Sequence, residues 1–370
     1  MSVTSPAPHR PHATRCPAPA WLGLLRNRWE ITALVALAIA PLVVPAIGGA
    51  LGGQVTTLFI YCILALGLNV MVGYTGLVHL GIAAFFGIGA YVFAILTVPM
   101  FPFRLPFLVA AVIASLVSAA VGLALGAPTL QLRGDYLAIV TLGFGEVVKV
   151  TLRNLEHVTG GMKGLNPVPP PGSGLTLAGR DLGLAFAVDP RWFYYLALAT
   201  LAAVVFALGR LEHSRLGRAW VAVREDELAA EAMGVSASRT KLSAFALSSA
   251  IAGLAGCLYV ASLSTTADPN AYDFNRSIIV LCAVILGGLG SIPGALFGVG
   301  LLVGFDTIVA PWADAAIQQW EINPSGSSLL SFSGWRLAIF GLALILVMRF
   351  RPEGLMPSTR LAAELHEVRS

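Results

Sequence analysis

The charged stretch Gly217-Arg-Ala-Trp-Val-Ala-Val-Arg-Glu-Asp-Glu-Leu-Ala-Ala-Glu-Ala-Met-Gly234 lies between two apolar segments, at about 192–209 and 241–263. Each of these segments is about long enough to cross a membrane. The region 210–241, which contains the stretch, holds six Arg or Lys side chains in a chain that is otherwise poor in charge. This alternation of apolar segments with a basic loop predicts a membrane protein with many spans.

The same stretch predicts a short helix inside the loop. Residues 219–233 are rich in alanine, and Gly234 stands where a helix commonly ends in a left-handed residue. On one continuous helix, Val221, Leu228 and Ala232 would share a face. The pattern fits a docking segment for a cytoplasmic partner, and it equally fits a solvated helix held by its own charges.

The whole composition supports a chain made for lipid. Of the 370 residues, 57% are hydrophobic and 11% are charged, and the mean hydropathy is +0.81. Soluble domains average about a quarter charged residues. The sequence predicts an all-α, polytopic membrane protein with about ten transmembrane helices, some of them broken or rich in glycine. The predicted segments are 31–47, 54–72, 77–98, 107–127, 135–150, 192–209, 241–263, 277–289, 292–310 and 335–350.

The distribution of Lys and Arg predicts the orientation, because basic residues gather in cytoplasmic loops. A disordered tail, 1–28, precedes a transmembrane domain, 29–351, and a C-terminal tail, 352–370, follows it. Both tails and the loop 210–241 are basic and are expected in the cytoplasm. The longer loop 151–191 is expected outside. A location in the cytoplasmic membrane, with both termini in the cytoplasm, fits this pattern.

Two glycine-rich clusters are candidates for the substrate pathway. So many glycines weaken a helix, but they let backbones approach closely and let a span unwind where protein or water covers it. Simple packing of small residues between helices is the alternative. In the second cluster, 285–298, Pro293 and the glycines predict a broken or hairpin-like pair of helices. The pathway candidates of the two clusters are Asn69, Gly73, Gly76, His79, Gly81, Gly288 and Gly290.

Glu146 is the acidic candidate for the pathway. It lies near one end of a short predicted span, 135–150, where a charged group normally faces a cavity or a partner. Lys149 follows three residues later, so an ion pair within the helix, or a side chain that reaches the outer surface, is the other interpretation.

The motifs of common enzyme classes are missing from the sequence. There is no Gly-x-x-x-x-Gly-Lys-[Ser/Thr] phosphate loop, no zinc-ligand spacing among the six histidines, and no Gly-x-Ser-x-Gly elbow. The four cysteines show no paired spacing, so we expect neither a disulfide nor a metal. The pI of about 9.0 reflects positive inner loops and not nucleic-acid binding. We therefore expect a protein that is not an enzyme and holds no cofactor itself.

With these residues assembled, the chain resembles the membrane permeases of branched-chain amino acid ABC importers, of the LivM type. The resemblance covers about residues 55–350. It is carried by Gly-Tyr-Thr-Gly-Leu-Val-His-Leu-Gly-Ile-Ala-Ala-Phe-Phe-Gly-Ile-Gly-Ala-Tyr at 73–91, Leu-Arg-Gly-Asp-Tyr-Leu-Ala-Ile-Val-Thr-Leu-Gly-Phe-Gly-Glu at 132–146, the inner loop at 217–242, and Gly-Gly-Leu-Gly-Ser-Ile-Pro-Gly at 287–294. His79 and Ile82 depart from the family pattern, which puts the substrate preference in question.

The resemblance implies partners and roles. It implies a homologous second permease subunit, two ATP-binding subunits that use the ATP, and an extracytoplasmic binding protein that delivers the substrate. Thr159, Gly160 and Gly161 would lie near the docked binding protein. The segment that docks on an ATPase subunit would contain Arg224, Glu225, Asp226, Glu231, Ala232 and Gly234.

The function expected from the resemblance is translocation of branched-chain amino acids or a related small polar solute. Permeases of the same family for urea or short amides are the alternative. A self-sufficient secondary transporter or channel would need its own coupling-ion site or selectivity filter. Glu146 is the only good candidate ligand for such a site, and one carboxylate is weak evidence for it.

Overall fold

The computed structural model describes residues 50–102, 104–129, 135–171, 176–177, 180–181, 190–263, 268–319, 335–350 and 354–356. The predicted first span, 31–47, and the predicted tail 1–28 lie outside the described residues. Of the predicted tail 352–370, the structure describes residues 354–356, where Leu355 and Met356 donate their N–H groups to the carbonyl oxygens of Leu286 and Gly287. Every other predicted span coincides with a described helix. The prediction of an all-α, polytopic fold is confirmed.

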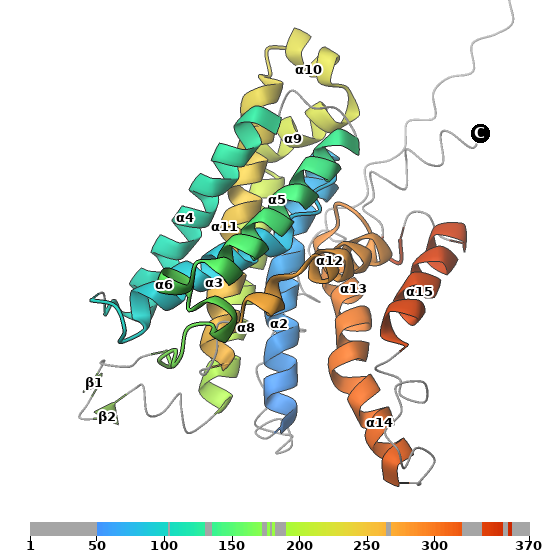
Figure 1. The fold of residues 1–370 in the computed structure, drawn as a ribbon. Helices are drawn as coiled ribbons and strands as arrows, with labels where there is room; N and C mark the ends of the chain where they lie inside the picture. Colours follow the sequence, from blue (N-terminus) through green and yellow to red (C-terminus); the bar gives the residue numbers. More distant parts are fainter. Residues whose placement is uncertain are drawn as a thin grey trace, which may run out of the picture.

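The main bundle is built around a central helix, α11 (Ala237–Leu263), which packs against three others (Figure 1). Small residues let these helices approach closely. A side chain on Gly89 would overlap the backbone of Gly253, and one on Gly253 would overlap Ser118. Such close contact between backbones is how helices associate inside a membrane, where lipid competes for apolar surface. The neighbours of α11 are α2 (Ala50–Asn69), α3 (Ile82–Thr97) and α4 (Phe107–Thr129).

A second group of helices packs against the other side of α2. Helices α12 (Phe274–Gly287) and α13 (Ile292–Gly304) form a hairpin, and both contact α2. In Figure 1, α12 lies across the upper end of α13, in the middle of the molecule. The predicted hairpin at this glycine cluster is confirmed. Beyond α13 the chain continues through the π-helix η5 (Phe305–Val309) into α14 (Ala310–Gln319), and α15 (Arg336–Phe350) packs against α12.

The connecting segments lie at opposite ends of the bundle. Helices α9 (Arg215–Glu225) and α10 (Glu227–Ala232) cap one end, after α8 (Pro190–Glu212), as Figure 1 shows. The other end carries α6 (Glu156–Thr159), which follows α5 (Asp135–Asn154), and the 3₁₀ helix η3 (Gly161–Lys163). A two-residue antiparallel pair, β1 (Thr176–Leu177) and β2 (Arg180–Asp181), also belongs to the segment after α5. The described parts of the predicted loops 210–241 and 151–191 thus lie at opposite ends of the bundle, and the side of the membrane that each loop faces stays a prediction.

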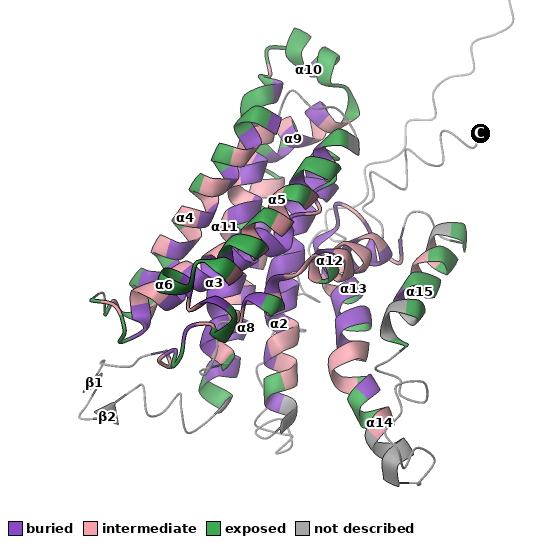
Figure 2. Cartoon of the chain, in the orientation of Figure 1, coloured by how far each residue is buried: buried purple, intermediate pink, exposed green. Residues whose placement is uncertain are grey.

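Burial distinguishes the helices of the interior from those of the periphery. Among the described residues, five helical segments are long and apolar enough to cross a membrane: Gly52–Tyr74, Phe107–Thr129, Arg191–Glu212, Ala237–Leu263 and Ile292–Asp314. The outer face of α4 is exposed and apolar, with Leu108, Val112 and Leu116 on the surface, whereas α2 and α11 are mostly buried (Figure 2). Exposed leucine and valine on a spanning helix indicate contact with lipid.

The predicted span 77–98 needs a correction at its start. The helix begins only at Ile82, because the chain between Thr75 and Gly81 is irregular. Gly76, in the left-handed region with φ of 70°, turns the backbone out of the preceding helix. We call residues 75–81 the break, since α2 and α3 lie on either side of it.

Candidate transport and coupling site

The break follows a change in the winding of the helix that precedes it. After Asn69 the helix continues as the π-helix η2 (Val70–Tyr74), all of whose residues are buried. Thr75 then donates its hydroxyl to the carbonyl oxygen of Met71 at 2.6 Å. π-turns often mark functional sites, and irregular backbone at membrane depth is stable only where protein or a water-lined cavity covers it. Protein covers η2, whereas Gly76 and Val78 of the break are exposed.

The turn between α12 and α13 provides part of this cover. Asn69 Oδ1 accepts a hydrogen bond from the backbone N–H of Gly290 at 2.9 Å, and Asn69 Nδ2 donates to the carbonyl oxygen of Ser291 at 3.5 Å. A Cβ on Gly73 would lie 2.5 Å from the Gly290 nitrogen. The structure therefore brings four predicted pathway residues together, from two glycine clusters that are far apart in the sequence: Asn69, Gly73, Gly288 and Gly290.

The turn itself depends on its glycines. Gly288 and Gly290 have φ of 125° and 75°, in the region that other residues rarely adopt. Ser291 then caps α13, since its hydroxyl accepts from the N–H of Gly294 at 3.1 Å. The α12–α13 turn can approach α2 closely only because Gly288 and Gly290 give it this backbone shape and because Gly73 has no side chain.

The far end of the break is held by α5. Leu80 donates its N–H to Thr141 Oγ1 at 3.1 Å, and a side chain on Gly81 would overlap the Thr141 carbonyl group. His79 is 1% exposed and packs between the rings of Phe85 and Phe245, each 5.5 Å away between centroids. Its Nδ1 accepts the N–H of Gly81 at 3.0 Å, and no described group bonds its Nε2. His79 thus fixes the shape of the break from inside.

Glu146 lies beside this region but pairs with its own helix. Its carboxylate is 3.7 Å from Lys149 Nζ, and the Glu146 side chain is 44% exposed. Among the described residues, no hydrogen bond or ion pair joins it to the break or to the α12–α13 turn. The geometry favours the ion pair over a pathway role in this conformation of the chain.

The predicted single helix over 219–233 is wrong, because Asp226 divides it. Asp226 has an extended backbone, with φ of −153°, and its carboxylate accepts from the N–H groups of Leu228 and Ala229 at 2.9 and 3.0 Å. An aspartate that caps a new helix in this way overrides the helix propensity of its alanine neighbours. Val221 is therefore on α9, and it does not share a face with Leu228 and Ala232 on α10.

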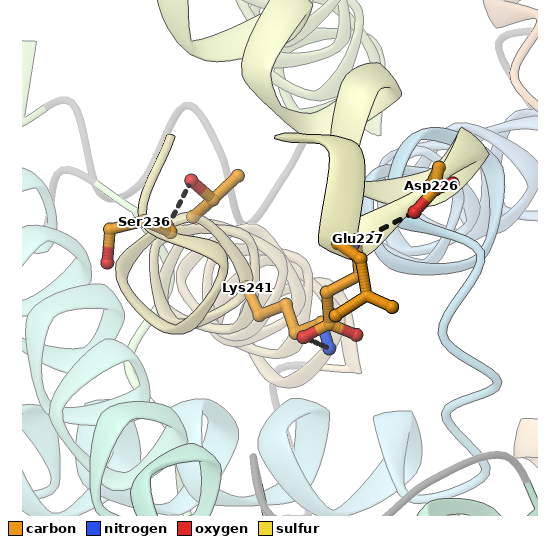
Figure 3. A network of polar contacts seen from close by, with 6 residues as sticks. Asp226, Glu227, Ser236 and Lys241 are labelled. Carbon is orange, nitrogen blue, oxygen red and sulfur yellow. Dashed lines mark hydrogen bonds and ion pairs between the residues drawn. The ribbon is translucent and has the colours of Figure 1, made fainter. Parts of the chain in front are cut away.

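The tip of this segment is open to solvent and internally braced. Lys241 pairs with Glu227 at 2.6 Å, next to the Asp226 cap (Figure 3). Leu228 and Met233 are 75% and 84% exposed, and Gly234 has φ of 85°, as its predicted place after the helix requires. Exposed apolar side chains on a braced turn suit contact with another protein. Besides Gly234, the exposed members of the predicted docking set are Glu225, Asp226, Glu231 and Ala232.

Arg224 differs from the rest of the predicted docking set. It is partly buried, its Nη1 donates to the carbonyl oxygen of Gly73, and its stem packs where a side chain on Gly76 would be, with Cγ 3.1 Å from that Cβ position. Arg224 thus joins the predicted docking segment to the predicted pathway, a connection that the sequence did not reveal.

Trp220 strengthens the same connection and was missed by the sequence analysis. It is buried, and its indole N–H donates to the carbonyl oxygen of Thr240 at 3.0 Å and lies 2.9 Å from Ser243 Oγ. Its ring stacks on Tyr74 of η2, with 6.4 Å between centroids. A tryptophan in a charged loop is the signal that could have indicated this anchor.

At the opposite end, the predicted binding-protein residues form a tight turn. Thr159 is buried and donates to the carbonyl oxygen of Leu152 at 2.6 Å, while Gly160 and Gly161 have φ of 71° and 58°. These three residues shape the turn, and the exposed side chains that it presents are those of neighbours such as His157 and Met162.

A second missed residue is Arg276 on α12. The predicted span began at residue 277, one position after this arginine, so its charge was not counted as intramembrane. Its Nη1 donates to the Tyr61 hydroxyl, and its Cζ lies 5.4 Å from the Tyr61 ring and 5.0 Å from the Tyr259 ring. A charged residue at the start of an apolar run is the signal that could have found it. Within the described residues, no group of three His, Cys, Asp or Glu could hold a metal ion.

Comparison with known proteins places this geometry in a family context. Residues 50–348 match the family described as the permease component of the branched-chain amino acid transport system. The chain is 38% identical over 319 residues to the high-affinity branched-chain amino acid transport system permease protein LivM of Salmonella typhimurium strain LT2, covering 82% of this chain and 69% of that protein. LivM of Escherichia coli K12 gives the same values. LivH of Escherichia coli K12 is 30% identical over 146 residues, 35% of this chain and 46% of that protein. No solved structure matches the chain.

Proposed function

This chain belongs to the family of branched-chain amino acid transport permeases and is a permease subunit of an ABC importer, and from this premise we propose that it forms half of a pathway for branched-chain amino acids. A binding protein would deliver the solute from outside, and the subunit itself would catalyse no bond chemistry. The relatives that are named as branched-chain amino acid permeases support this solute class.

One observation carries the proposal: the contact of Arg224 with the break. An importer driven by separate ATPase subunits must pass their movement to the solute pathway. In this chain the exposed turn around α10 leads directly into α9, and Arg224 and Trp220 of α9 contact Gly73 and Tyr74 of η2. A push on α9 and α10 would therefore reach the irregular segment where α2, α3 and the α12–α13 turn meet.

The partners follow from the same arrangement. We propose that the surface with Leu228, Met233 and Glu231 docks on an ATP-binding subunit, and that the ATP is used there and not by this chain. A homologous second permease, for which LivH-type proteins are the model, would complete the pathway. A membrane position with the α9–α10 end in the cytoplasm would place the α6 end toward the binding protein.

Uptake by the complete transporter in proteoliposomes tests the proposal. With binding protein outside and ATP sealed on the ATPase side, labelled L-leucine should accumulate, and the non-hydrolysable analogue of ATP should stop it. Accumulation that needs an ion gradient but no ATP would contradict the proposal and support a secondary transporter.

A further inference from the structure

Arg276 lies in a cluster of tyrosines that come from different parts of the chain. Tyr61 comes from α2 and Tyr259 from α11, and both rings lie against the guanidinium group, which also bonds the Tyr61 hydroxyl. Tyr272, just before α12, packs edge-on against Tyr259 at 6.4 Å between centroids. Its hydroxyl is buried without a hydrogen-bond partner among the described residues. The cluster thus combines a cation, aromatic rings and a hydroxyl without a described partner.

No carboxylate forms an ion pair with this cation within the described part of the chain, although Asp273 and Asp306 act electrostatically on the neighbouring Tyr61. The described ion pairs are those of Lys149 with Glu146 and of Lys241 with Glu227. Asp273, the closest acid in sequence, instead accepts the backbone N–H of Arg276 and the side-chain amide of Asn275, both at 3.2 Å. A partly buried charge without a partner is costly, so such groups normally meet an opposite charge.

The backbone makes the position still less favourable for a cation. Arg276 is in the first turn of α12, which starts at Phe274. The N-terminus of a helix carries partial positive charge and stabilises anions, whereas it repels cations. Stacking on tyrosine rings offsets part of this cost, but it does not remove the charge. An anion beside Arg276 would meet the guanidinium and the helix N-terminus together.

We propose that Arg276, beside the ring of Tyr259, binds the carboxylate group of the solute as it passes through the permease. This inference rests on the proposed function and names the residue that recognises the carboxylate group of its amino-acid solutes. Urea and short amides have no such group and could not form the charged, bidentate contact that arginine makes with a carboxylate. Arg276 and Tyr259 both remain partly exposed.

Equilibrium binding to the complete transporter tests the inference. The transporter, reconstituted in nanodiscs without binding protein, is titrated with labelled L-leucine against unlabelled L-leucine or L-leucinamide, which keeps the side chain and the ammonium but lacks the carboxylate. We expect leucine to compete at least about tenfold better than leucinamide, which corresponds to about 1.4 kcal/mol. Arg276→Gln should abolish this preference, and Arg276→Lys should keep part of it.

Two further variants separate recognition from a purely structural role. Tyr61→Phe removes the hydroxyl that bonds Arg276 but leaves the guanidinium free to bind a carboxylate, so the preference for leucine should persist. Arg104→Gln, on the exposed chain between α3 and α4, is the matched control and should behave as the wild type. ATPase stimulation by loaded binding protein shows whether each variant assembles. Should Arg276→Gln not assemble, Arg276→Lys and Tyr61→Phe still decide the question.

Several results would overturn the inference. One is equal competition by leucine and leucinamide in the wild type, and another is an unchanged preference in assembled Arg276→Gln. Loss of the preference in assembled Tyr61→Phe would also overturn it, since that points to a structural contact between helices. Absence of any leucine binding, while ATP-dependent uptake works, would remove the carboxylate site and leave the proposed function intact. Absence of ATP-dependent uptake would instead contradict the proposed function.

Discussion

Arg224 of α9 donates a hydrogen bond to the carbonyl oxygen of Gly73 in η2, across 151 residues of sequence. The contact couples two segments of different character, a surface helix with exposed charges and a buried π-turn. The Gly73 carbonyl is available for it because the π-turn alters the regular i to i−4 bonding of the α-helix. A charged donor on such a carbonyl makes a stronger bond than a neutral one. If α9 moves, then either η2 and the break that follows it move as well, or this bond is lost.

The first prediction follows from this bond. Arg224→Gln should lower ATP-driven uptake about tenfold, because a hydrogen bond from a charged group contributes on the order of 1.5–3 kcal/mol. Hydrolysis of ATP by the complex should continue, so the two rates should separate. Arg218→Gln is the control, since Arg218 is also on α9 but bonds the nearby carbonyl of His213 on the surface. Equal loss of uptake in both variants would show that charge on α9, and not the Gly73 contact, matters.

The contact of α2 with the α12–α13 turn gives the second prediction. Gly73→Ala would place a Cβ 2.5 Å from the Gly290 nitrogen, so we expect a loss of stability of about 1–3 kcal/mol and little assembled transporter. Gly300→Ala in α13 is the matched control, because no atom lies within 4 Å of its Cβ position and alanine favours helix. Thermal unfolding in detergent measures both. A Gly73→Ala variant as stable as Gly300→Ala would contradict the described approach of the two backbones.

The turn after α10 gives the third prediction. Gly234 has φ of 85°, and space around its Cβ position is open, so only backbone strain opposes a substitution. Gly234→Arg should cost about 1–2 kcal/mol and disturb the docking surface, whereas Gly234→Asn should be tolerated because asparagine visits this conformation. Copurification of the ATPase subunit with each variant is the measurement. Retention of the subunit by both variants would mean that the turn does not contribute to docking.

The predicted orientation can be tested at described, exposed positions. In a variant without the native cysteines, His157→Cys next to the α6 turn should react with an impermeant thiol reagent from outside, and Ser238→Cys should react only from the cytoplasm. The two ends of the bundle carry these positions, so opposite labelling is required by the fold. Labelling of both from one side would contradict the six predicted spans before the loop 210–241.

The sequence predicted the elements of this fold better than their contacts. Apolar length and glycine composition were sufficient for the spans and for the α12–α13 hairpin, because both depend on local chemistry. The bond between Asn69 and Gly290 joins residues 221 positions apart, and no local pattern encodes such a pairing. The division of the docking helix was missed because alanine propensity outweighed the capping signal of Asp226 in our interpretation. Arg276 was missed because the span was started one residue too late.

The last prediction concerns Glu146, for which the sequence left two interpretations. Its ion pair with Lys149 is 3.7 Å long and partly exposed, and such pairs within a helix contribute only a few tenths of a kcal/mol. Glu146→Gln keeps the shape of the side chain, so we expect nearly unchanged stability and leucine uptake within about twofold of the wild type. Lys149→Gln, which breaks the same pair from the other side, should give the same small effect. If Glu146→Gln alone reduces uptake strongly at matched protein levels, the carboxylate acts on the solute, and Glu146 then belongs to the pathway in another conformation of the transporter.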